Sequence, residues 1–158
     1  MTHPLIDIGA NLGHESFAHD LPAVLQRARD AGLVHQLVTG TTLPASQQAL
    51  EICTHYPHLS CTAGIHPHEA AHADADVLAG IRALLNEPLV KAVGETGLDF
   101  NRDFSPRPAQ EKVFNEHLAM ATATGKPVFL HQRDAHERFL PILKDHRDAL
   151  SGGVVHRF

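Results

Sequence analysis

The sequence has little positive charge. Lysine and arginine number 13 against 18 aspartate and glutamate residues, which gives a formal net charge of −5. This balance argues against a broad basic face for non-specific binding of nucleic acid. It leaves open a local site at which a bound metal ion supplies the positive charge.

Cysteines and long apolar runs are also scarce. The only cysteines are Cys53 and Cys61, predicted to lie in a helix and a strand as buried thiols, which fits a reducing cytosol. The start "MTHPLIDIGANL" has no basic region and no long apolar run, so we expect no signal peptide. No window approaches about 18 apolar residues. We therefore expect a cytoplasmic location and no membrane partner.

Short apolar runs alternate with helical patterns along the 158 residues, which predicts a single domain over 1–158. The runs read as buried parallel strands. The helix 134–150 contains Pro141, which should kink or restart it. Strands are expected at 5–8, 36–39, 61–65, 89–94, 127–130 and 153–156, and helices at 20–32, 44–56, 72–86, 107–125 and 134–150.

This βαβ rhythm fits either a doubly wound α/β sheet or a TIM-type (β/α)8 barrel. Polar residues follow each expected strand, and in a barrel all of these strand ends meet at one rim, where barrel enzymes work. No glycine-rich phosphate loop follows the first strand. We therefore predict the α/β barrel, of which about the first six βα units are present.

Three of these polar residues form a candidate metal site. Glu95, His131 and His156 come from successive strand ends, and two imidazoles with a carboxylate suit a divalent metal ion. Coordination would also explain why the apolar strand 89–94 runs into a carboxylate, because burial alone would raise its pKa. The alternative is that these groups are satisfied polar side chains at a barrel mouth.

Further candidates surround this set. His66 could contact a substrate phosphate, be an extra ligand or, equally well, hydrogen-bond the backbone of its loop, and for His68 the backbone hydrogen bond is the simpler expectation. Arg133 could bind a phosphate through two hydrogen bonds or form a salt bridge with Asp134 or Asp99. Asp99 could orient a metal ligand or cap a turn. Asp7 could serve the metal or the loops.

Five motifs resemble the TatD family of metal-dependent deoxyribonucleases, most closely its TatD subgroup. They occur in the family's order along essentially the whole chain, and the fourth and fifth are long and specific. The motifs are "LIDIGANLGHESF", "VTGTTLPASQQAL", "TAGIHPHEA", "VGETGLDFNRDFS" and "FLHQRDAHERF".

The resemblance implies a metal-dependent hydrolase barrel and a nuclease, a 3′-to-5′ exodeoxyribonuclease for single-stranded DNA and possibly RNA. It implies Mg²⁺ as the cofactor, with Mn²⁺ or Zn²⁺ as alternatives, and it suggests DNA repair as a pathway. By motif match, Glu95, His131 and His156 are implied as metal ligands. His66 is implied as a contact to the scissile phosphate. Glu95 and His66 are then the catalytic residues, and His66 and Arg133 bind the substrate.

Two departures from the family pattern stand out. Gly9 and Asn11 occupy the places of a His-x-His metal pair that many relatives carry, so one metal position should be weakened or lost. The chain also has six expected strands where a (β/α)8 barrel has eight and about 250 residues. We therefore expect a C-terminally truncated barrel that lacks a further metal-binding or catalytic aspartate of the family.

Two rival functions stay open. The same site could hydrolyse an ester, as in a D-aminoacyl-tRNA deacylase, because a geometry that activates water for one bond can serve the other. Alternatively, the chain could be an inactive truncated form of the nuclease. Its two open barrel edges, the first and sixth strands, would then invite pairing into an oligomer.

Overall fold

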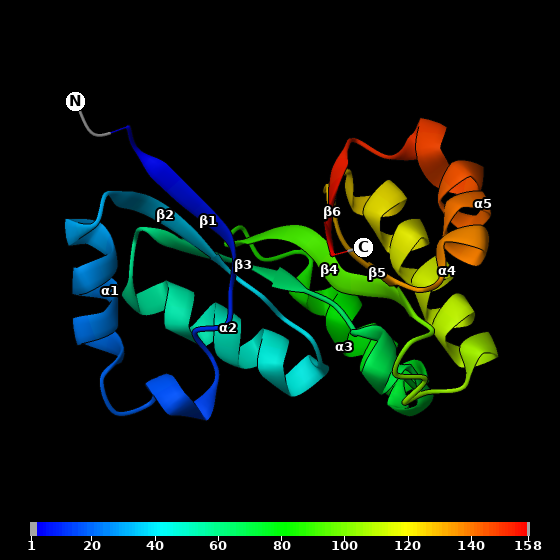
Figure 1. Ribbon diagram of the computed structural model, residues 1–158, viewed down its shortest axis with the longest axis horizontal. Helices are drawn as coiled ribbons and strands as arrows, with labels where there is room; N and C mark the ends of the chain where they lie inside the picture. Colours follow the sequence, from blue (N-terminus) through cyan, green and yellow to red (C-terminus); the bar gives the residue numbers. More distant parts are fainter. Residues whose placement is uncertain (1–2, 158) are drawn as a thin grey trace.

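Parallel strands alternate with helices in the computed structural model, which describes residues 3–157 (Figure 1). The strands are β1 (Leu5–Ala10), β2 (Leu33–Val38), β3 (Leu59–Ala63), β4 (Val90–Asp99), β5 (Val128–Arg133) and β6 (Gly153–Arg157). The α-helices are α1 (Leu21–Asp30), α2 (Leu43–His55), α3 (Ala75–Leu84), α4 (Arg107–Thr124) and α5 (His136–His146). Three 3₁₀ segments are η1 (Glu15–Phe17), η2 (Pro67–His72) and η3 (Arg147–Ala149).

The order of the strands distinguishes the two predicted architectures. Each strand pairs in parallel with the next, in the order β1-β2-β3-β4-β5-β6. A doubly wound sheet reverses its strand order at a switch point, and this sheet has no reversal. The six strands form a nearly closed barrel with alternating helices, so the predicted barrel class is confirmed.

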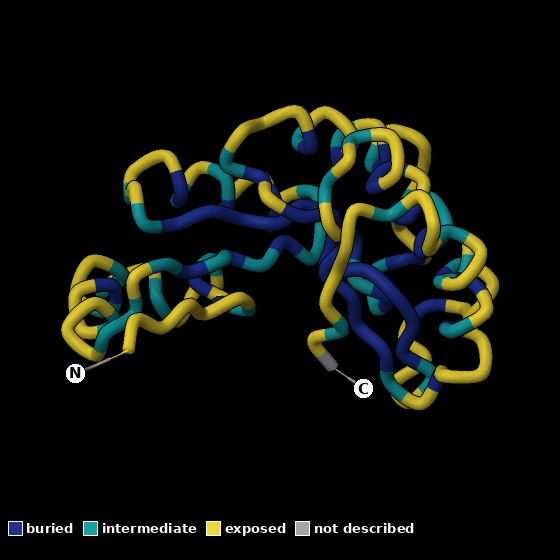
Figure 2. Tube along the Cα trace, turned by 90° about the horizontal axis from the view of Figure 1, so that it is seen from above, coloured by how far each residue is buried: buried dark blue, intermediate teal, exposed yellow. Residues whose placement is uncertain are grey.

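The prediction that all six strands are buried holds for the middle of the sheet and is wrong for its edges. Every residue of β3 is buried, whereas most of β1 and the described part of β6 are exposed (Figure 2). Among residues 3–157, β1 and β6 each pair with only one neighbouring strand, which explains the exposure. A mainly apolar cavity of about 700 Å³ lies beside β6 and is lined partly by α5.

The two edges nevertheless approach each other. A Cβ atom added at Gly9 of β1 would lie 3.2 Å from Cε1 of His156 in β6, and 3.7 Å from Cζ of Phe129 in β5. Gly9 is therefore a position where the absence of a side chain makes room for the His156 ring.

Strand β4 is longer than predicted. It continues to Asp99, so Glu95 lies inside the strand rather than after it, and the predicted end at residue 94 is wrong. The pairing with β5 is irregular between Gly94 and Thr96, and Gly94 and Gly97 have φ angles of 138° and 144°. A Cβ at either glycine would collide with a backbone carbonyl of β5. Because they lack a Cβ, the two glycines can adopt these φ angles and approach β5 closely, so the strand continues through the irregular region. In the sequence, the same glycines suggest that the strand ends.

The helices lie close to their predicted ranges, with two differences. Helix α3 begins at Ala75 rather than at residue 72, because the Asp74 side chain caps it by accepting the Val77 N–H, and η2 ends before it at His72. Helix α5 continues through Pro141, which lies inside it at an exposed position, so of the two expected effects, a kink or a restart, the restart does not occur. Within residues 3–157, no helix is both long enough and apolar enough to cross a membrane.

Helix α4 contributes a fully buried histidine that supports the segment after β3. The His117 ring donates from Nδ1 to the Val113 carbonyl (2.8 Å) and accepts the Ile65 N–H at Nε2 (3.0 Å). Burial lowers the pKa of His117 to about 4, against the opposing effect of its hydrogen bond to the Val113 carbonyl. The fold therefore requires a neutral ring at this position.

We predict that acid destabilises the protein through His117. Its pKa is about 6.5 unfolded and lower when folded, so its contribution is complete above pH 6.5 and declines as the pH falls toward about 4. The loss is at most about 3 kcal/mol. His117→Gln retains an acceptor for the Ile65 N–H and should show a shallower fall in the free energy of unfolding between pH 7 and pH 5. Urea denaturation at several pH values measures it.

The exposed His72 provides the matched control. His72→Gln should keep the wild-type dependence on pH. Equal slopes for wild type and His117→Gln would show that His117 is not the group that titrates.

Candidate active site

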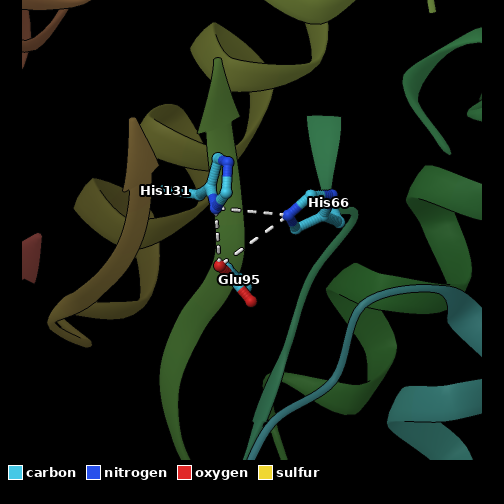
Figure 3. A group of neighbouring side chains, drawn as sticks. All are labelled: His66, Glu95 and His131. Atoms are coloured by element: carbon cyan, nitrogen blue, oxygen red, sulfur yellow. Dashed lines mark hydrogen bonds and ion pairs between the residues drawn. The ribbon is translucent and has the colours of Figure 1, made fainter. Parts of the chain in front are cut away.

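Three side chains from different segments meet in the carboxyl-terminal halves of β4 and β5 and just after β3 (Figure 3). Glu95 comes from β4, His131 from β5, and His66 from the segment between β3 and η2. Nδ1 of His131 lies 3.0 Å from Oε1 of Glu95, and Nε2 of His66 lies 3.3 Å from Nδ1 of His131. All three candidate ligand atoms lie within 4.8 Å of one another. Glu95 and His131 are buried, with 8% and 5% exposure.

The backbone of the loop after β2 sets the positions of two of these residues. The amide of Glu95 donates to the Gly40 carbonyl (2.8 Å), and the amide of His66 donates to the Thr41 carbonyl (2.9 Å). Parallel pairing places Gly97 of β4 opposite His131 of β5, which aligns the two strand ends. The site therefore depends on the order of neighbouring strands, as expected for a barrel rim.

Asp99, the last residue of β4, lies behind the cluster and is 1% exposed. Its Oδ2 lies 3.2 Å from Nε2 of His131 and 2.8 Å from Nε2 of His68, and its Oδ1 accepts the N–H groups of Asn101 and Arg102. Burial raises its pKa, but these hydrogen bonds outweigh burial and lower the pKa to about 2. Asp99 is thus an anionic acceptor for both histidines.

These contacts assign protons to the rings. His131 donates from Nε2 to Asp99, so a neutral ring presents the bare Nδ1 lone pair to Glu95. His66 accepts the His68 N–H at Nδ1 (3.2 Å), so its neutral ring carries its proton on Nε2, directed at the cluster. We assign His131 the tautomer with its proton on Nε2 because Asp99 is the more deeply buried carboxylate, and in this assignment Nδ1 of His131 is an acceptor that faces the Nε2 donor of His66.

The donor set fits a divalent cation. A carboxylate oxygen and a bare imidazole nitrogen, 3.0 Å apart, are both electron-rich, and they need a cation or a proton between them. Burial by itself raises the pKa of Glu95, but its close contacts with His131 and the other nearby histidine rings lower it below its usual value. Burial lowers the pKa of His66 to about 4, which keeps that ring neutral. An anionic carboxylate beside neutral imidazoles is a typical metal-binding set.

A polar cavity of about 460 Å³ opens above the cluster. Its walls carry two arginines against three carboxylates, so an excess of positive charge in the cavity requires a bound cation. The cavity is lined by Thr41, Thr42, His66, His68, Glu69, Glu95, Asp99, Arg102, His131, Arg133 and His156.

The structure does not place all the predicted ligands equally. His156 lines the same cavity and stacks on Phe129 with ring centroids 5.1 Å apart, but it lies outside the tight group, whose second histidine is His66. Arg133 also faces the cavity, and in the described part of the chain it forms no ion pair with Asp99 or Asp134.

Two other candidates differ from the simplest expectation. His68 pairs with the Asp99 carboxylate rather than using its ring on the backbone, so the backbone expectation is wrong. Asp99 fulfils both of its alternatives, because it contacts a candidate ligand and also accepts the amides of the following turn. Asp7 is exposed and accepts the Gly9 amide (2.9 Å), away from the cluster.

Sequence reasoning did not single out Arg102. It lies in the segment after β4, between this strand and α4, and its side chain lines the cavity. Its position within the long motif "VGETGLDFNRDFS" was the available signal.

Comparison with known proteins relates this site to a family. The family described as TatD related DNase matches residues 6–158. The chain is 47% identical over 154 residues to "3'-5' ssDNA/RNA exonuclease TatD" of Klebsiella pneumoniae, covering 98% of this chain and 59% of that protein. It is 48% identical over 155 residues to the protein of the same name from a Rahnella species, with 98% and 59% covered.

Solved structures agree with the sequence relatives. The crystal structure of YJJV, a TatD homolog from Escherichia coli, superposes with a TM-score of 0.90 at 31% identity, covering 98% of this chain and 60% of that one. A TatD family hydrolase from Entamoeba histolytica gives a TM-score of 0.88 at 29% identity, with 98% and 58% covered. The chain thus spans about three fifths of the length of the relatives it matches. The family match and the curated relatives show that this chain belongs to the TatD related DNase family.

Proposed function

We propose that the site hydrolyses phosphodiester bonds of single-stranded DNA, and of RNA, from the 3′ end with a divalent metal ion as cofactor. The observation that carries the proposal is the pair formed by the Glu95 carboxylate and the bare Nδ1 of His131, both aimed at one point in a polar cavity. Relatives 45–48% identical to this chain are named 3'-5' ssDNA/RNA exonucleases, which supports the substrate and polarity.

In this proposal Glu95 and His131 hold the metal ion, with His156 as a further ligand from the cavity wall. When bound, such an ion polarises a phosphate oxygen and lowers the pKa of a coordinated water. Mg²⁺ is the proposed ion because the resemblance to the TatD family implies it, and the two imidazoles keep Mn²⁺ and Zn²⁺ as alternatives.

The protein groups bind the phosphate and move the proton. His66 donates from Nε2–H to a non-bridging oxygen of the scissile phosphate. Arg133 offsets its negative charge from the cavity wall. The free carboxylate oxygen of Glu95 accepts the proton of the attacking water.

The buried, unlinked thiols of Cys53 and Cys61 support the proposed cytoplasmic location.

We predict that Glu95→Gln abolishes metal-dependent degradation of single-stranded DNA. The substitution keeps the shape of the side chain but removes its charge and its ability to accept a proton, which should lower the rate by about 100-fold or more. The assay follows 5′-labelled and 3′-labelled oligonucleotides in Mg²⁺, beside a chelated sample. Cleavage from the 3′ end shortens the 5′-labelled strand stepwise.

Glu87→Gln is the matched control, because Glu87 is exposed and lies outside the cavity. It should degrade DNA like the wild type. No metal-dependent cleavage by the wild-type chain would contradict the proposal for this chain. Release of a D-amino acid from D-aminoacyl-tRNA without loss of labelled DNA would favour the ester hydrolase instead.

We also predict that Asp99→Asn weakens metal binding. The amide nitrogen would replace an oxygen beside Nε2 of His131, and Nε2 would have to accept, which moves the ring proton to Nδ1 and removes a ligand. Affinity for Mn²⁺, used as a paramagnetic probe of the site, should fall by about 10- to 100-fold. Titration followed by electron paramagnetic resonance measures it without any need for turnover.

Asp103→Asn tests whether the effect is specific, since Asp103 is exposed in the same loop and pairs with Arg107. It should bind Mn²⁺ like the wild type. Unchanged Mn²⁺ affinity in a folded Asp99→Asn variant would show that Asp99 does not set the ring proton of His131.

A further inference from the structure

Phe104 is the most exposed of the large apolar side chains in the described residues, at 65%. The other strongly exposed members of this group lie on strands β1, β2 and β6. Phe104 instead lies in the loop between β4 and α4, beside the active-site cavity. Its exposure therefore does not follow from a position on the sheet.

The loop holds Phe104 in place from both sides. On one side, Asp103 forms two hydrogen bonds with Arg107, at 2.7 and 2.9 Å. On the other, the buried Ser105 hydroxyl accepts the Ala71 amide (2.9 Å) and donates to the His68 carbonyl (2.8 Å). These hydrogen bonds order the backbone on both sides of the exposed Phe104 ring before any ligand binds. Binding of a ligand to the ring would therefore cost little further conformational entropy.

Phe104 also continues the wall of the cavity. Its ring packs edge-to-face against the His68 ring, with centroids 4.8 Å apart, and the Arg102 guanidinium lies 5.8 Å from its centroid. Both His68 and Arg102 line the cavity that contains Glu95 and His131. An exposed aromatic face and a cation thus lie together next to the proposed phosphate site.

We propose that Phe104 stacks against a nucleobase of the single-stranded substrate while Arg102 contacts an adjoining phosphate. The inference rests on the proposed function and names a binding subsite for it. An aromatic face beside cationic side chains is the recurring solution for single strands, because every base has a π face and every linkage carries a charge. A base paired within a duplex has no free face, so the subsite favours unpaired strands.

The test measures binding with oligothymidylate probes whose phosphorothioate linkages resist hydrolysis, in Mg²⁺, by fluorescence anisotropy. One probe carries all its bases and a second carries abasic residues at its 3′ end. Phe104→Ala should weaken binding of the complete probe by about 5- to 100-fold. It should change binding of the abasic probe little, because that probe has no base to stack. Phe104→Trp should retain binding of the complete probe.

Val34→Ala is the matched control, because Val34 is also an exposed apolar residue but lies on β2. It should bind both probes like the wild type. Equal losses on both probes in Phe104→Ala, no loss on either, or no binding of the complete probe by the wild type would overturn the proposal. A base-dependent loss in a protein that cleaves no DNA would uphold the subsite while removing the proposed hydrolysis.

Discussion

The buried carboxylate of Asp99 is the interaction on which the site depends most. One oxygen accepts the amides of Asn101 and Arg102 and so shapes the loop after β4, while the other faces the rings of His68 and His131. A single anion thereby couples the end of a strand, the loop that follows it and the protonation of a candidate ligand. Four hydrogen-bonding contacts compensate for its removal from water.

Helix α4 supports the same region from the side of the core. Gln110 and His117 are seven residues apart, which places them on one face of the helix, and both are fully buried. Gln110 holds the loop after β4 through the backbone of Asp99 and Ser105, and His117 holds the segment after β3 through Ile65. Buried polar groups on α4 therefore fix the two segments that carry His66, Asp99 and Phe104.

The electrostatics of the cavity differ from those of the whole chain. A net charge of −5 would repel a polyanion at long range, and in the cavity Arg102 and Arg133 offset the carboxylates of the lining only in part. The Glu95 carboxylate beside Nδ1 of His131 adds a place for a divalent cation. Recognition of a nucleic acid by this chain would thus rely on short-range contacts at the rim.

Much of the architecture and part of the site could be read from residue order alone. Short apolar runs separated by amphipathic segments indicate parallel strands, and polar residues after them indicate a rim. The irregular pairing at Glu95 could not be predicted from the sequence. It depends on the close approach of Gly94 and Gly97 to backbone carbonyls of β5, which is a contact between distant segments. The sequence by itself determined the alternation of strands and helices, since periodicity is local. Only the tertiary structure decided that His66, rather than His156, joins Glu95 and His131 in the tight group, and that Asp99 directs the ring proton of His131. Those outcomes depend on distances between segments that are far apart in the chain.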